Sequence, residues 1–314
     1  MDSNIHSMRI ITAYCWRIFG LLLVMTLITV PAFGHPPSAI VVDRQGQVYF
    51  VDVGVGVWKV DLQGHMVRHP GPHHHFMTID DQGSFVQQRL PRRIRGDVSV
   101  IGTHPTLIFS GEFPVEVGSD AALYYPQVAS DGHVQVIRLA PSGKSEVFAI
   151  LPVATEIGTD GKAVQAQWIH GLAAGPDGSL YYTEKHAVRR IAKDGTVSLV
   201  AGNVTVPDCV HPSGANDKRL GPALRDLEVG TDGTIYVAAS ACSAVLKITQ
   251  QGAVSVVLHG SDDWSPMGVA LSNGDLYVLE YRYIDTRKSE DWLPRVRKIS
   301  SNGEVSVIAS VDKR

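Results

Sequence analysis

The chain has 314 residues, a formal net charge of −3 at pH 7 and 44% hydrophobic residues. This length is ample for one large hydrophobic core. A nucleic-acid partner would normally require a basic surface, and the sequence has no stretch dense in lysine and arginine, which excludes that class.

The first 34 residues have the plan of a secretory signal peptide. Arg9 and Arg17 supply positive charge, an apolar run follows at 18–30, and small residues precede His35 at the expected cleavage site. The run is shorter than the roughly 20 residues that cross a bilayer as a helix. We therefore expect an exported protein, periplasmic or extracellular, with no membrane span after cleavage. An uncleaved N-terminal anchor is the alternative.

A repeated unit fills the rest of the chain, residues 35–314. Each unit has four short β-rich runs separated by Gly, Asp or Asn turns, which predict hairpins. Four strands at a period of roughly 40–50 residues are typical of a propeller blade. We therefore predict an all-β fold, a single six-bladed β-propeller of four-stranded blades whose ends meet by side-chain packing. The expected blades are 37–70, 73–102, 113–152, 170–202, 225–260 and 266–310.

The best example of the repeat, residues 171–202, reads GLAAGPDGSLYYTEKHAVRRIAKDGTVSLVAG. This pattern resembles the NHL-repeat propellers. Its GPDGSLYYTE stretch also resembles virginiamycin B lyase and the gluconolactonase/senescence-marker group. The resemblance covers nearly all of the chain after residue 34 and implies the propeller fold. It implies no single function, because this repeat serves both enzymes and scaffolds.

The direction of the strands assigns the long connections to one face of the propeller, the loop-rich face. Long irregular segments are expected there at 103–112, 153–169, 203–223 and 281–293. Short turns lie on the opposite face, the turn face. Because loops on a rigid scaffold often carry binding and catalytic groups, the loop-rich face is the candidate functional face.

Two cysteines, Cys209 and Cys242, fall on the loop-rich face of the same blade. In an oxidising compartment an even pair predicts a disulfide, which would tether the loop that precedes this blade. Two free or buried thiols are the alternative.

Candidate functional side chains are expected at the mouth of the central shaft on the loop-rich face. Histidine and carboxylate groups ligate metals and act as general acids and bases. The candidate catalytic residues are His75, His170, Glu184 and Glu280. Of these, His75, His170 and Glu184 are the candidate ligands of a divalent cation such as Ca²⁺, Mg²⁺ or Zn²⁺. The alternative for the acids is a structural role, in which they lock the blade through hydrogen bonds.

The enzyme families that the chain resembles are each matched only in part. Amidating lyases of similar fold place zinc-binding histidines around the shaft, but only two of six equivalent positions here are histidine. The PNG motif of the gluconolactonase-like enzymes is absent from the innermost strands. Virginiamycin B lyase is matched by the Tyr-Tyr-Thr-Glu stretch and by the presence of His and Glu. No motif for covalent catalysis is present.

Two functions therefore compete. The first is a scaffold that binds a protein, peptide, glycan or small molecule on the loop-rich face, with loop aromatics as the main contacts. These aromatics, for which blade packing is the alternative role, are Trp168, Trp264, Tyr281, Tyr283 and Trp292. The second is a metal-assisted hydrolase or lyase, in which Arg225 binds an anionic group of the substrate.

Overall fold

The computed structural model divides the chain into two units, Met1–His35 and Pro36–Arg314. The expected signal peptide and Trp168 lie outside the residues whose structure is described. The described residues are 38–52, 55–69, 74–86, 98–102, 105–157, 163–166, 169–209, 221–260, 263–283 and 292–312.

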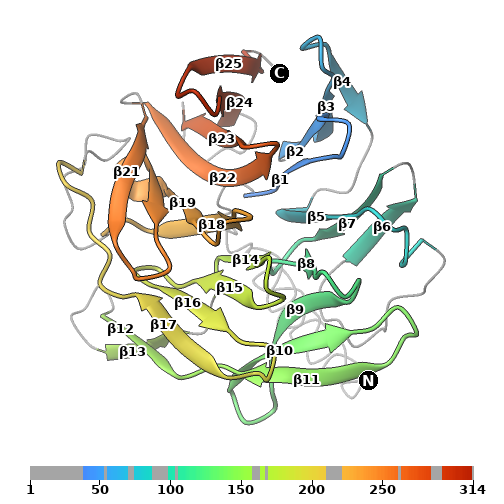
Figure 1. Cartoon of the computed structure of the whole chain (residues 1–314), viewed down its shortest axis with the longest axis vertical. Coiled ribbons are helices and arrows are strands. Elements are labelled where there is room, and N and C mark those ends of the chain that lie inside the picture. The colour runs from blue at the N-terminus through green and yellow to red at the C-terminus, as the bar shows by residue number, and fades with distance from the viewer. Residues whose placement is uncertain are drawn as a thin grey trace, which may run out of the picture. The chain divides into compact units, whose positions relative to one another are not determined.

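Six antiparallel sheets form the blades of a propeller, as predicted, and Figure 1 looks down on this ring. Blade 1 consists of β1 (Ile40–Val42), β2 (Val48–Asp52), β3 (Gly56–Val60) and β4 (Met66–His69). Blade 3 consists of β8 (Glu116–Val117), β9 (Leu123–Val128), β10 (Val134–Leu139) and β11 (Ser145–Ile150). Blade 4 consists of β14 (Gly171–Ala174), β15 (Leu180–Thr183), β16 (Val188–Ile191) and β17 (Val197–Ala201).

The two C-terminal blades have the same strand order. Blade 5 consists of β18 (Leu224–Val229), β19 (Ile235–Ala239), β20 (Ala244–Ile248) and β21 (Val254–His259), with a short 3-10 helix at Ser240–Cys242. Blade 6 consists of β22 (Trp264–Ser272), β23 (Asp275–Tyr283), β24 (Trp292–Ile299) and β25 (Val305–Ser310). In the part of the chain that the structure describes, no helix is long and apolar enough to cross a membrane.

Blade 2 differs from the expected pattern. Its described strands are β5 (Phe76–Asp80), β6 (Val98–Gly102) and β7 (Thr106–Ser110), and they pair in the order β5-β7-β6. The stretch 103–112, expected as an irregular loop, therefore contains β7, which is the direct neighbour of the innermost strand. All five residues of β7 are buried, because the strand lies between two others.

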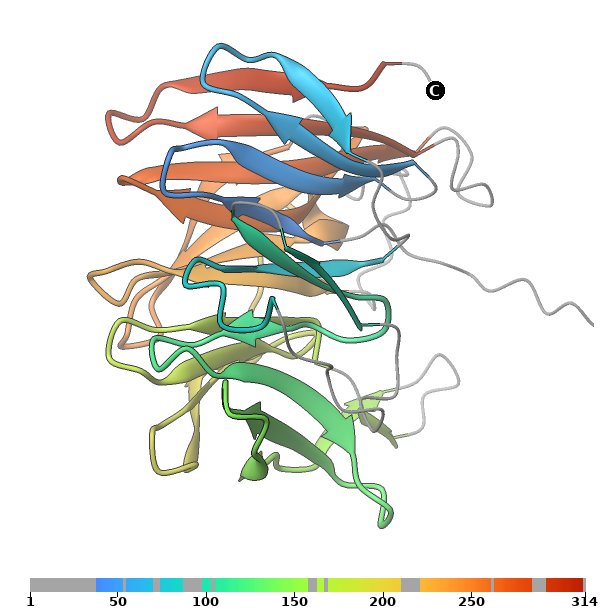
Figure 2. The same ribbon diagram turned by 90° about the vertical axis from the view of Figure 1, so that its right-hand side faces the viewer.

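A second expected loop, 153–169, also contains strands. It forms a two-stranded sheet of β12 (Ala154–Ile157) and β13 (Ala163–Ala166) between blades 3 and 4. The loop-rich face therefore carries an added hairpin, which is visible at the side of the ring in Figure 2.

Burial is lowest in the outermost strands of blades 1, 3, 4, 5 and 6. All five residues of β2 are buried, whereas four of the six residues of the outermost strand β11 and three of the six of β25 are exposed. An inner strand packs against neighbouring blades on both faces, and an outer strand contacts water, so the inner runs are more apolar. Side chains also fix the tight turns: Asp177 Oδ1 accepts the Ser179 N–H at 3.1 Å, and Gly178 adopts a φ of +76°.

Blades 6 and 1 close the ring by side-chain packing, as predicted. The Tyr281 hydroxyl donates to the Val51 carbonyl at 2.6 Å, and both blades contribute to one apolar cluster. Gly268 permits the approach, because a Cβ there would lie 2.0 Å from the Ser38 carbonyl oxygen. Each of these two blades supplies its own four strands, so no strand is shared.

Candidate functional site

The innermost strand of blade 5 brings Arg225 and Asp226 to the shaft. The pairing of β18 with β19 shifts register where these two residues lie. Such a bulge changes the direction of side chains and is common beside functional sites. Blade 4 packs against this bulge. The Thr183 hydroxyl donates to the Arg225 carbonyl at 2.5 Å, and Gly171 leaves room for the contact, because a Cβ there would lie 2.8 Å from the same oxygen.

Arg225 and His170 lie side by side at the loop-rich mouth. The Arg225 Nη1 is 3.4 Å from His170 Nδ1, and the Arg225 Nε is 3.4 Å from the Ser240 hydroxyl. A guanidinium can only donate, so His170 Nδ1 is the acceptor in this contact. The Ser240 hydroxyl in turn donates to the Ala223 carbonyl at 3.0 Å. The contacts therefore place a guanidinium and an imidazole next to each other at this mouth.

The acids predicted at this mouth are engaged by arginines of their own blades. Glu184 accepts from Arg189 Nε at 2.7 Å. Glu280 has no exposed side-chain surface and accepts from Arg295 Nε at 2.7 Å and from Arg297. These contacts support the structural alternative for both carboxylates, in which they lock the blade through hydrogen bonds.

His75 and Asp52 are also held by neighbouring residues. The His75 backbone joins blades 1 and 2, because its carbonyl accepts the Ser38 N–H at 3.2 Å and its own N–H donates to Ser110 at 3.1 Å. The fully buried Asp52 accepts from the Trp58 indole at 3.1 Å. Among the described residues, no three His, Cys, Asp or Glu side chains form a group able to hold a metal ion. The metal set of His75, His170 and Glu184 remains a prediction.

The predicted binding aromatics are mainly part of the framework. Tyr281 has no exposed surface and Trp292 is 4% exposed, both within the packed cluster of blades 6 and 1. Burial leaves them no surface for a ligand, and blade packing is their role. Trp264 is half-buried, with the Arg295 guanidinium 3.9 Å above its ring.

The predicted disulfide is confirmed. Cys209 and Cys242 are joined, with their Cα atoms 4.6 Å apart. Cys242 is buried in the core of blade 5, and Cys209 packs against the same core. The bond therefore tethers the connection between β17 and β18 to the blade that carries Arg225.

Sequence reasoning missed a group of carboxyls inside the shaft. Glu116 on β8 and Asp226 and Glu228 on β18 lie half-buried on innermost strands. The Thr78 hydroxyl of blade 2 donates to Glu116 at 3.0 Å, and Asp226 accepts the Val269 N–H of blade 6 at 3.2 Å. These contacts join innermost strands of neighbouring blades, which no ladder of backbone hydrogen bonds connects.

Burial shifts the pKa of each shaft carboxyl upward. Loss of hydration, and then the nearby Glu228, raises the pKa of Glu116 to about 8. Burial raises the pKa of Glu228 to about 7, and it raises that of Asp226 well above its ordinary value. Near neutral pH, protonated and ionised forms of Glu116 and Glu228 therefore coexist in the shaft. Clusters of perturbed carboxyls are typical of functional sites, although structural networks show them too.

The shaft carboxyls predict an unusual pH dependence of stability. Glu116 keeps its proton in the folded protein to about pH 8, whereas an unfolded chain releases it near 4.5. The folded state binds more protons in this window, so stability falls as pH rises through it. Glu116→Gln should remove on the order of 1–2 kcal/mol of that fall, a value reduced because these side chains are only half-buried. Urea unfolding at pH 5 and pH 8.5 measures this, with Glu304→Gln as an exposed control; equal pH slopes for both variants would contradict it.

The comparisons with known proteins agree on the fold. No protein-family profile matches the chain, and no curated protein matches it. A putative gluconolactonase structure is 16% identical with a TM-score of 0.53, and the match covers 88% of this chain and 90% of that one. The calcium-binding protein regucalcin from Agrobacterium tumefaciens is 11% identical, with a TM-score of 0.50 and coverage of 77% and 81%. Virginiamycin B lyase from Staphylococcus aureus is 13% identical, with a TM-score of 0.42 and coverage of 89% and 85%. The matches to the putative gluconolactonase and to regucalcin show that the chain is similar in fold to these propellers.

Proposed function

We propose that this chain is an exported small-molecule-binding propeller whose loop-rich mouth recognises a ligand through its carboxylate or phosphate group. The observation that carries the proposal is the contact of Arg225 with His170 Nδ1, 3.4 Å apart, at the ends of two adjacent innermost strands. A guanidinium and an imidazole Nε2–H are donors, and they match an acceptor-rich anion.

The charges around the pair support an anion over a cation. Glu184 and Glu280, the acids predicted at this mouth, are each bound by arginine. A divalent cation ligated by His170 would be repelled by the guanidinium 3.4 Å from its ring. The geometry therefore favours ligand binding over the alternative, a metal-assisted hydrolase or lyase of the lactonase or virginiamycin B lyase kind. The similar structures support the fold of this chain and not its activity, because they are only 11–16% identical to it.

Export is supported by the disulfide between Cys209 and Cys242. Disulfides persist in oxidising compartments such as the periplasm and the extracellular medium, and they are rare in the reducing cytosol. The ligand would then be a molecule available outside the cytosol.

Arg225→Gln tests the proposal. A panel of small carboxylates and phosphates is screened by thermal unfolding, with and without EDTA. A ligand present at one hundred times its Kd should stabilise the wild-type protein by about 2.7 kcal/mol. The variant should lose that gain in stability, because the glutamine amide is uncharged and cannot form the charge-assisted hydrogen bonds of a guanidinium with an anion. EDTA should change neither the wild-type gain nor its loss in the variant.

Arg68→Gln is the matched control, since Arg68 lies exposed on the outer strand β4. It should keep the wild-type response. Stabilisation that persists in Arg225→Gln, or that requires a divalent cation, would contradict the anion-binding proposal and favour the metal-assisted alternative.

A further inference from the structure

A second pocket lies between blades 3 and 4, with a volume of about 470 Å³. Its lining residues come from the turns and strands beside Gly118 and Gly178, on the turn face of the propeller. Pockets of this volume hold small ligands. His170 and Arg225, at the loop-rich mouth, do not line this pocket.

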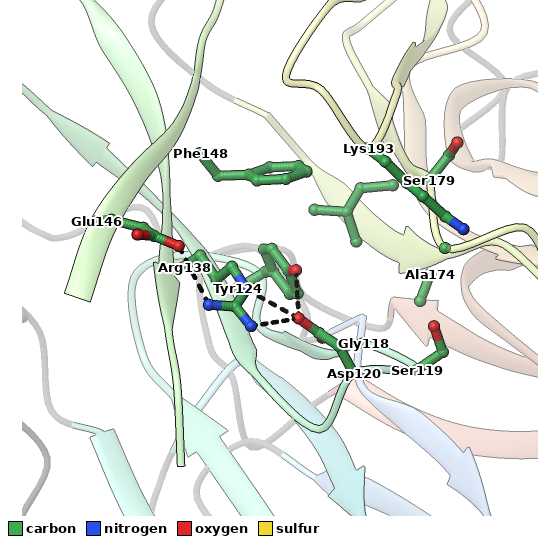
Figure 3. Close-up of a pocket in the computed structure, with 12 residues that line it drawn as sticks. Gly118, Ser119, Asp120, Tyr124, Arg138, Glu146, Phe148, Ala174, Ser179 and Lys193 are labelled. Carbon is green, nitrogen blue, oxygen red and sulfur yellow. Dashed lines mark hydrogen bonds and ion pairs between the residues drawn. The ribbon is translucent and has the colours of Figure 1, made fainter. Parts of the chain in front are cut away.

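Ion pairs fix one side of the pocket. Arg138 lies between two carboxylates, 2.7 Å from Asp120 and 3.1 Å from Glu146. The Tyr124 hydroxyl donates to Asp120 at 3.1 Å, and the Arg138 guanidinium holds the pKa of Asp120 below its usual value. Figure 3 shows these four side chains together. The network supplies fixed donors and acceptors, and its two carboxylates outnumber the one guanidinium.

An aromatic wall faces this network. Phe148 packs edge-to-face against Tyr124, with ring centroids 5.1 Å apart. Its ring remains half-buried on β11, so it lines the pocket together with the buried Leu180. Such a face accepts the C–H surface of a ring.

A cation lies across the pocket from the ion pairs. In Figure 3, Lys193 extends toward Ala174 and Ser119. The Lys193 Nζ and the Ser119 hydroxyl lie 3.5 and 3.6 Å from the same point, the Cβ position of Gly178. Gly178 thus permits the lysine to cross the turn, because a side chain there would meet Lys193 Cε at 2.7 Å. The ammonium and hydroxyl form a second donor group, suited to a carboxylate.

We propose that this pocket binds an acidic sugar unit, a hexuronate, of a glycan. The sugar ring packs on Phe148, its carboxylate contacts Lys193 and Ser119, and its hydroxyls bond with the fixed network around Arg138. The carboxylate oxygens of Asp120 and Glu146 can accept further hydrogen bonds, which sugar hydroxyls would donate and the ring of an aryl acid would not. The number of polar groups around a single aromatic face therefore favours a polyhydroxylated ring.

Isothermal titration of the purified protein with galacturonate disaccharide tests the inference. Wild-type protein should bind it, whereas neutral galactose and benzoate should bind about tenfold more weakly or not at all. Lys193→Met and Phe148→Ala should each weaken binding about tenfold, and Lys193→Arg and Phe148→Tyr should retain it. Lys193 is exposed, so its substitution keeps the test valid if Phe148→Ala fails to fold.

Three results would overturn the inference. The first is no binding of the uronate at millimolar concentrations. The second is equal binding of uronate and benzoate, which would show that the pocket does not select a sugar ring. The third is uronate binding that Lys193→Met leaves unchanged. None of these outcomes bears on the anion site of Arg225, which is tested by its own variant.

Discussion

Glu280→Ala should lower the free energy of unfolding by about 3–5 kcal/mol. Glu280 is fully buried and is the shared counter-ion of Arg295 and Arg297, whose side chains are 15% and 12% exposed. Removing the carboxylate leaves two nearly buried cations close together without their shared counter-ion. The cost is that of uncompensated buried charge, and it should appear as a lower midpoint in urea unfolding with an unchanged slope.

Glu304→Ala is the control for this prediction, because Glu304 is an exposed acid in the same blade. It should change stability by less than about 0.5 kcal/mol. If Glu280→Ala were as stable as the wild type yet lost ligand binding or an activity, the structural role would be refuted. The original prediction of a catalytic carboxylate at this position would then regain support.

Removing the disulfide should have the next largest effect. Cys209 and Cys242 are 33 positions apart in the sequence. Chain-entropy reasoning gives such a link about 3–4 kcal/mol of stabilisation. The double variant Cys209→Ala/Cys242→Ala should therefore unfold on the order of 5–10 °C below the wild type. Alanine is used because Cys242 lies in the apolar core, where a serine hydroxyl would add its own cost.

Reduction of the wild-type protein offers an independent measurement of the same bond. Thermal unfolding in dithiothreitol should lower the wild-type midpoint toward that of the double variant and leave the double variant unchanged. A double variant that unfolds at the wild-type temperature would show that the packing of blade 5 alone fixes this loop.

The sequence was sufficient to predict the blades whose turns are regular. Blade 4 follows its GPDG and KDG turns closely, because Asp side chains and positive-φ glycines determine where the strands end. Blade 2 was predicted less well, since its third strand precedes its second in the chain. A pattern read in chain order assumes sequential pairing, and nothing local in 98–110 signals the exchange.

The candidate site was predicted in part. His170 and Arg225 do meet, because they lie at the beginnings of the innermost strands of adjacent blades. Tyr281 and Trp292 belong to the core because β23 and β24 continue into the segment expected as a loop. The shaft acids did have a signal: Glu-Val-Gly occurs at 116–118 and again at 228–230, before the same turn of two blades. The pocket beside Lys193 had none, because its residues meet only when the two blades pack together.

The most direct test of the central claim is to locate a bound anion at the loop-rich mouth. Crystals of the wild-type protein and of Arg225→Gln, soaked in selenate, would be measured at the selenium absorption edge. We expect an anomalous peak within hydrogen-bond distance of Arg225 and His170 in the wild type and none there in the variant. A mouth without selenate in the wild type, or a metal ion bound to His170, would contradict it.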